Sequence, residues 1–75
     1  MLYYFDLKGA ARARDHQGER HASSADAISH AERKAWKTAA RQPELAASDC
    51  YISVVAESGC EIHRAMVGLL RHIAA

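Results

Sequence analysis

The residues with the most chemical potential lie in one short stretch, DCYISVVAESGCEIHR, residues 49–64. It holds both cysteines of the chain, Cys50 and Cys60, and one of the five histidines, His63. Thiolate and imidazole groups are common zinc ligands, and thiolates also carry redox chemistry. The chain has no C-x-x-C pair, however, and the four-ligand spacing of a zinc site is absent. Whether these three residues can act together depends on how the segment folds.

The segment alternates like a β-hairpin, with strands over residues 50–56 and 60–66. We expect a three-residue loop, Glu57-Ser58-Gly59, with Gly59 in the left-handed conformation. A two-residue loop would mix polar and apolar residues on both faces, and burial of one face sets the register. The expected pairs are Ala56 with Cys60, Val54 with Ile62, Ile52 with Arg64, and Cys50 with Met66. The inner face then carries Cys50, Ile52, Val54, Ala56, Cys60, Ile62, Arg64 and Met66, and the outer face Tyr51, Ser53, Val55, Glu61, His63 and Ala65.

This register separates the three residues. Cys50 and Cys60 share a face but lie roughly 20 Å apart along the ladder, whereas a disulfide needs Cα atoms within about 7 Å. His63 points to the opposite face from Cys60, so the two cannot share a metal. We interpret both cysteines as buried and inert. The other four histidines, at positions 16, 21, 30 and 72, form no i, i+4 pair, so we expect no metal site and no cofactor.

Catalysis is not expected either. Asp49, Ser53 and His63 supply the residue types of a serine hydrolase, and Ser53 and His63 share the expected outer face. No nucleophile elbow surrounds the serine, and the glycine-rich phosphate-binding patterns are absent. A chain of 75 residues also leaves little room for a substrate pocket. We therefore expect that the protein is not an enzyme.

One set of charged residues suggests a binding surface. The polar side of the predicted helix carries His30, Arg33, Lys34, Lys37 and Arg41. Four cations at this spacing could follow the phosphate backbone of a nucleic acid or contact an acidic partner. The alternative interpretation is an ordinary solvated helix face, which the near-neutral net charge of +1 favours.

The helix that positions this surface is the most clearly signalled element. Ser23 and Ser24 are good N-cap residues, with an acid, Asp26, in the first turn. Pro43 predicts the end of the helix, which gives a range of about residues 24–42. Ile28, Ala31, Ala35 and Ala39 fall on one apolar stripe, and Trp36 lies at its border to supply bulk.

The remaining segments complete a single domain over residues 1–75. A strand is predicted over about 2–7, with Tyr3, Phe5 and Leu7 on the buried face. Asp15 to Gly18 has turn chemistry and precedes a short strand over about 19–22. A polar linker is expected over 44–49, and the tail, 67–75, combines helix-compatible leucines with a glycine that favours a break. The order β-β-α-β-β predicts an α+β fold, in which one helix packs on one face of a small antiparallel sheet of three to four strands, with a short C-terminal helix as an alternative for the tail.

Composition limits the core that this fold can build. Hydrophobic residues make up 49% of the chain, but sixteen of them are alanines, which bury little area. Small domains of this kind have thin stability margins, so we expect self-association. The first residues lack the pattern of a signal peptide, and no apolar run reaches the length of a membrane span. A cytoplasmic location with reduced cysteines and no membrane contact is the expectation.

Four short motifs in this order resemble a family of small bacterial proteins, the domain of unknown function 6894 (DUF6894). They are the aromatic-aromatic-Asp strand from Tyr3 to Leu7, the acid-x-x-Gly turn from Asp15 to Gly18, the capped alanine-rich helix from about Ser24 to Arg41, and the strand that closes on an acid-x-Gly turn, from Ile52 to Gly59. The resemblance covers about residues 2–66. It implies the topology and no activity, so no catalytic residues are carried over.

Two functions follow as expectations. The first is a small cytosolic protein–protein interaction module that forms a homodimer or other homo-oligomer and has no catalytic activity. The second is a regulator that contacts nucleic acid or a toxin partner through the basic helix face, because the layout resembles small antitoxins of the HicB type at the level of fold.

Overall fold

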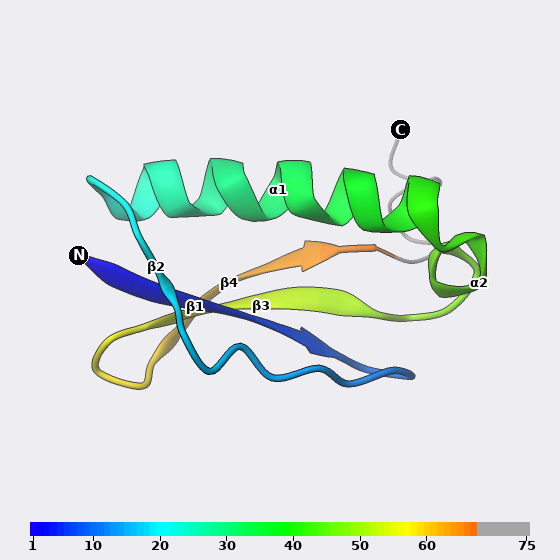
Figure 1. Cartoon of the computed structure of the whole chain (residues 1–75), viewed down its shortest axis with the longest axis horizontal. Coiled ribbons are helices and arrows are strands. Elements are labelled where there is room, and N and C mark those ends of the chain that lie inside the picture. The colour runs from blue at the N-terminus through cyan, green and yellow to red at the C-terminus, as the bar shows by residue number, and fades with distance from the viewer. Residues whose placement is uncertain (68–75) are drawn as a thin grey trace.

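A computed structural model describes residues 1–67 of the chain (Figure 1). Its elements are β1 (Leu2–Lys8), β2 (Glu19–Arg20), α1 (Ser24–Arg41), α2 (Pro43–Ala46), β3 (Tyr51–Ala56) and β4 (Glu61–Met66). The strands form one antiparallel sheet in the order β2-β1-β3-β4, and α1 lies along one face of it. The predicted α+β class is confirmed. The expectation of a short helix in the tail falls on residues 68–75, outside the described residues.

Local side-chain chemistry explains where α1 begins and ends. The Ser23 hydroxyl caps the N-terminus by accepting a hydrogen bond from the backbone N–H of Asp26 at 3.1 Å. Asp26 in the first turn and Arg41 in the last turn both complement the helix dipole. We expected a polar linker after Pro43. The short helix α2 begins there instead, with Pro43 in its first turn, where a missing N–H costs nothing.

The contact between α1 and the sheet is made by alanines. Ala27, Ala31 and Ala35 are completely buried at i, i+4 spacing, so the helix axis can approach the sheet closely. Trp36, which was expected to supply bulk to this contact, is 61% exposed, and Ile28 is only half-buried. The bulk comes from the sheet instead. The described core consists of Tyr3, Phe5, Ala27, Ala31, Ala35, Cys50, Ile52, Val54, Ala65 and Val67.

The loop between β1 and β2 is held by the carboxylate of Asp15. Its Oδ2 accepts a hydrogen bond from the backbone N–H of Phe5 at 3.1 Å, and its Oδ1 accepts from the N–H groups of Gln17 and Gly18. Gly18 adopts a φ of +74°, as the predicted turn requires. The Asp6 carboxylate in turn accepts a hydrogen bond from the N–H of Asp15 at 2.8 Å. These bonds bring the loop against β1.

The β3–β4 hairpin departs from the expected register. The turn itself is as predicted: Gly59 has a φ of +95°, and the N–H of Ala56 donates to the Cys60 carbonyl at 2.8 Å. A β-bulge then places one extra residue, Ile62, in β4, and the remaining pairs shift by one position. The observed pairs are Val55 with Glu61, Val54 with His63, Ser53 with Arg64, Ile52 with Ala65, and Tyr51 with Met66.

The bulge reverses the faces of β4 after Ile62, so two expectations are wrong, and a third is wrong at Cys60, which precedes the bulge. His63 and Ala65 lie on the helix-covered face rather than the outer face, because they pair with Val54 and Ile52. Arg64 lies on the outer face, where its guanidinium stacks over the Tyr51 ring at 4.7 Å. Cys60 is exposed rather than buried, whereas Cys50 is buried as expected. The physical reason is that the bulge exposes a charge and buries Ala65, which a regular ladder could not do.

Candidate functional site

The five residues of the predicted basic face line one groove on α1. Thr38 and Gln42 complete its lining, and its volume is about 220 Å³. The residues that the sequence predicted there are His30, Arg33, Lys34, Lys37 and Arg41. They fall together because steps of three and four residues return to the same side of a helix. The alanine stripe holds a neighbouring side of α1 on the sheet, and the Lys and Arg side chains of the groove remain exposed.

The groove continues toward the loop that Asp15 anchors. A second hollow, of about 420 Å³, lies between α1 and this loop. Lys34, Thr38 and Gln42 line both hollows, and Arg14 adds a further cation from the loop side. The combined surface is therefore predominantly basic and wider than the helix face alone.

Asp15 and Glu19 are the acidic side chains of this combined surface, and the loop backbone holds the carboxylate of Asp15. Burial raises the pKa of its carboxyl, but hydrogen bonds from the backbone of Gly18, Phe5 and Gln17, with the nearby Lys34 ammonium, outweigh burial and leave the pKa below its ordinary value. The carboxylate is therefore ionised at neutral pH and is already occupied by backbone donors. It shapes the loop and leaves the groove cations available to another anion.

His30 differs from the other groove residues. It was expected on the solvated side of the helix, but its side chain is only 27% exposed and its ring packs against Phe5 at 4.9 Å. Burial lowers the pKa of His30 more than the adjacent Glu19 carboxylate raises it. His30 is therefore neutral near pH 7, and four cations provide the positive charge of the groove.

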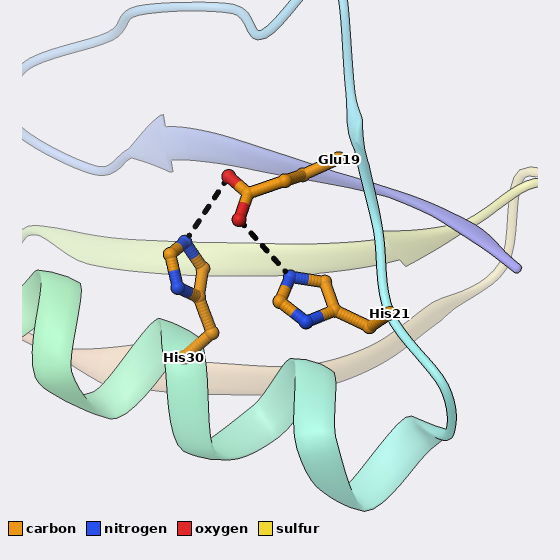
Figure 2. Close-up of side chains that lie close together, drawn as sticks. All are labelled: Glu19, His21 and His30. Carbon is orange, nitrogen blue, oxygen red and sulfur yellow. Dashed lines mark ion pairs between the residues drawn. The ribbon is translucent and has the colours of Figure 1, made fainter.

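At the N-terminal end of the groove, His30 joins a cluster that the sequence analysis did not predict. Figure 2 shows the Glu19 carboxylate between the rings of His21 and His30, with one oxygen directed at each ring. Oε1 of Glu19 lies 3.3 Å from Nε2 of His21, and Oε2 lies 3.3 Å from Nε2 of His30. One ligand atom from each of the three residues lies within 4.8 Å of the others.

Two neighbours hold the His21 ring in place. Its Nδ1 lies 2.9 Å from Oδ2 of Asp26, and this hydrogen bond is the main reason that the pKa of Asp26 is lowered. The Phe5 ring meets the His21 ring edge-on, with centroids 5.6 Å apart. The side chain of His21 is 10% exposed. Its Nε2 is buried and has no hydrogen-bond partner among the described residues.

The signal for this cluster was present in the sequence but weak. Glu19 and His21 are two apart in an extended segment, so their side chains point to the same side. His30 lies nine residues further along, beyond the helix N-cap. Only the packing of α1 on the sheet brings it back to the first two, and spacing alone does not predict that packing.

The residue types of a serine hydrolase do not come together. Ser53 and His63 lie on opposite faces of the sheet, since Ser53 pairs with Arg64 while His63 pairs with Val54. The Ser53 hydroxyl donates a hydrogen bond to the Glu61 carboxylate. His63 instead contacts the Glu32 carboxylate of α1 at 2.8 Å. Within residues 1–67, no imidazole lies beside Ser53.

Comparisons with known proteins place the chain in one family. Among the described residues, no helix combines the length and the apolar character needed to cross a membrane. No curated protein and no solved structure matches the chain. A family match extends over residues 2–68, nearly the whole chain, and agrees with the resemblance seen in the β1, turn, α1 and β3 motifs. The chain belongs to the family described as "Domain of unknown function (DUF6894)".

Proposed function

We propose that this protein is a non-catalytic binding module that contacts the sugar–phosphate backbone of a nucleic acid through the α1 groove. The observation that supports this is the convergence of four cations, Arg33, Lys34, Lys37 and Arg41, on one groove. All four are exposed. Phosphate contacts of this kind supply most of the affinity of sequence-independent nucleic-acid binding.

The dimensions of the groove suit a backbone better than an enclosed small molecule. From His30 to Arg41 the helix rises about 16 Å at about 1.5 Å per residue. One strand of a B-form duplex presents a phosphate about every 3.4 Å along its axis, so several phosphates could lie along the groove. Small-molecule pockets usually enclose about 300–1,000 Å³, whereas the α1 groove has about 220 Å³ and no Phe, Tyr or Trp side chain in its lining.

The test compares two triple variants with the same loss of charge. Lys34→Ala/Lys37→Ala/Arg41→Ala removes groove cations, and Lys8→Ala/Arg12→Ala/Arg20→Ala removes three cations outside the groove. Fluorescence anisotropy would measure binding of labelled single-stranded RNA and duplex DNA over a series of salt concentrations. We expect the groove variant to bind more weakly and to reduce the slope of log K against log salt by about 2 for single-stranded RNA and by about 3 for duplex DNA. Loss of binding in the second variant alone, or no salt-dependent binding by the wild type, would contradict the proposal.

Self-association through the edge of β4 is a second candidate. Within residues 1–67, β4 is the last strand of the sheet, and an edge strand offers backbone groups to a second chain. Ile62 is 37% exposed on this strand. Trp36 is 61% exposed and lies on the side of α1 that faces β4. It is one helical turn from Glu32, and Glu32 contacts His63 of β4. These exposed apolar side chains flank the edge.

Sedimentation velocity over a concentration series tests this candidate. We compare Ile62→Lys with Ser58→Lys, which adds the same charge to the exposed turn. Dissociation of a wild-type dimer by Ile62→Lys but not by Ser58→Lys would support it. A wild type that stays monomeric at tens of micromolar would rule it out.

A further inference from the structure

The two nitrogens of the His21 ring have different surroundings. Nδ1 contacts the Asp26 carboxylate at 2.9 Å, and this contact requires a proton on Nδ1, because a carboxylate only accepts hydrogen bonds. Nε2 is buried, faces Glu19, and has no hydrogen-bond partner among the described residues. A buried polar atom without a partner is costly, and most such atoms have a structural reason. The question is what Nε2 binds.

A metal cation between the facing groups would satisfy the lone pairs on both sides. A neutral His21 that donates from Nδ1 directs the Nε2 lone pair toward the oxygens of Glu19, and lone pairs do not attract each other. A proton on Nε2 could bridge to Glu19, but this contact, at 3.3 Å, lacks hydrogen-bond geometry. A metal ion accepts lone pairs from all of these atoms at once.

The separations match a metal site. Zinc binds imidazole nitrogen and carboxylate oxygen at about 2.0–2.2 Å in tetrahedral geometry, which places neighbouring ligand atoms about 3.3 Å apart. Each imidazole Nε2 lies 3.3 Å from a different oxygen of the Glu19 carboxylate, and one ligand atom from each of the three residues lies within 4.8 Å of the others. A small movement of side chains would centre an ion among them.

We propose that Glu19, His21 and His30 bind a divalent first-row transition-metal ion, with Zn²⁺ as the ion tested first. Two imidazoles and one carboxylate are ligands that Zn²⁺ accepts, and a fourth position remains for water or another ligand. The three ligands come from β2, the segment that follows it, and α1 (Figure 2). The ion therefore cross-links the β2 segment to the helix, in a domain with a small core.

The surroundings of the ligands support this assignment. Metal-binding histidines usually donate their second N–H to a carboxylate, which fixes the ring, and Asp26 occupies that position for His21. Phe5 packs edge-on against both imidazoles, at 5.6 Å and 4.9 Å.

The experiment uses the full chain, stripped of metal with a chelator and titrated with Zn²⁺. Isothermal titration calorimetry measures affinity, and long-range ¹H–¹⁵N spectra of the histidine rings report which nitrogens bind. We expect one ion per chain and a higher midpoint of thermal unfolding. We also expect shifts at His21 and His30, with none at His16 or His63. This spectrum of the wild type does not depend on whether any variant folds.

Variants then test each ligand. Glu19→Gln keeps the size of an exposed side chain and should weaken Zn²⁺ binding by more than about 100-fold, and Asp26→Asn by about 10–100-fold. His16→Ala and Cys60→Ser are the controls and should bind as the wild type does. No stoichiometric binding, ring shifts at other histidines, or loss of binding in Cys60→Ser would overturn the proposal. None of these variants removes a groove cation, so this result and the nucleic-acid result are independent.

Discussion

At the base of the β3–β4 hairpin, Cys50 and Ile52 lie on the helix-covered face and are at most 2% exposed. At the other end of the same hairpin, Cys60 is exposed and Ile62 is 37% exposed, although the residue types are the same. In Figure 1 the turn of the hairpin lies away from α1. The comparison shows that cover by the helix decides burial here, because alternation alone would assign both pairs of residues to the same face.

The two isoleucines test this comparison with the largest expected effect. Ile52→Ala should lower the free energy of unfolding by about 2–5 kcal/mol, because it leaves a cavity beneath α1. Ile62→Ala removes the same atoms from the exposed bulge and should lower the free energy of unfolding by less than about 1 kcal/mol. Urea denaturation followed by circular dichroism measures both. Equal effects would mean that the hairpin end is covered in solution, as a dimer through β4 would require.

The two cysteines give a second test of this comparison, with an expected change in stability of intermediate size. The Ser48 hydroxyl donates a hydrogen bond to the sulfur of Cys50 at 3.1 Å, and the thiol is fully buried. Cys50→Ser places a second hydroxyl in this apolar site and should cost about 1–3 kcal/mol, while Cys60→Ser should cost less than about 0.5 kcal/mol.

Thiol labelling checks the same difference without substitution. Iodoacetamide should modify Cys60 in the native protein and Cys50 only after unfolding, as mass spectrometry of the peptides would show. Rapid modification of Cys50 under native conditions would show that the base of the hairpin opens readily.

Lowering the pH should change the free energy of unfolding least. This effect acts through His30, which packs against the sheet face that α1 covers. The pKa of His30 is lowered mainly by burial, so the unfolded chain takes up a proton at a higher pH than the folded chain does. Without metal, the free energy of unfolding should therefore fall as the pH drops below about 6.5, the ordinary histidine value, and stop falling below the folded pKa. Thermal unfolding between pH 7.5 and pH 5 in a chelator measures this. His30→Gln should reduce the pH dependence, and an unchanged dependence would contradict it.

The helix shows how far the sequence alone could lead. Ser23 and Pro43 predicted its ends because capping and proline geometry act within one turn of the chain. The same local rules predicted the positive φ of Gly18 and Gly59. The five basic residues were predicted on one face and lie along one groove, since helical spacing is regular, although burial of the His30 ring was not foreseen. Thr38 and Gln42 were missed because neutral residues give no charge pattern.

The hairpin shows where sequence reasoning failed. Every residue of β4 after the turn was assigned to a regular ladder, and the unfavourable position of Arg64 was the one sign of an irregularity. The β-bulge at Ile62 moved Arg64 to the outer face and Ala65 to the inner face. A bulge adds one residue with little local signature, so a pattern with period two cannot locate it.

The sequence by itself determined α1, the strands, their order, their turns and the basic side of α1, because neighbours within about one helical turn or one hairpin control these features. The tertiary structure alone decided which cysteine is buried, which face His63 occupies, and that Glu19, His21 and His30 meet. The physical reasons are the β-bulge at Ile62, which sets the face of His63, and the close approach of the Ala27, Ala31 and Ala35 stripe to the sheet. That approach sets distances between residues far apart in the chain, which no local periodicity records.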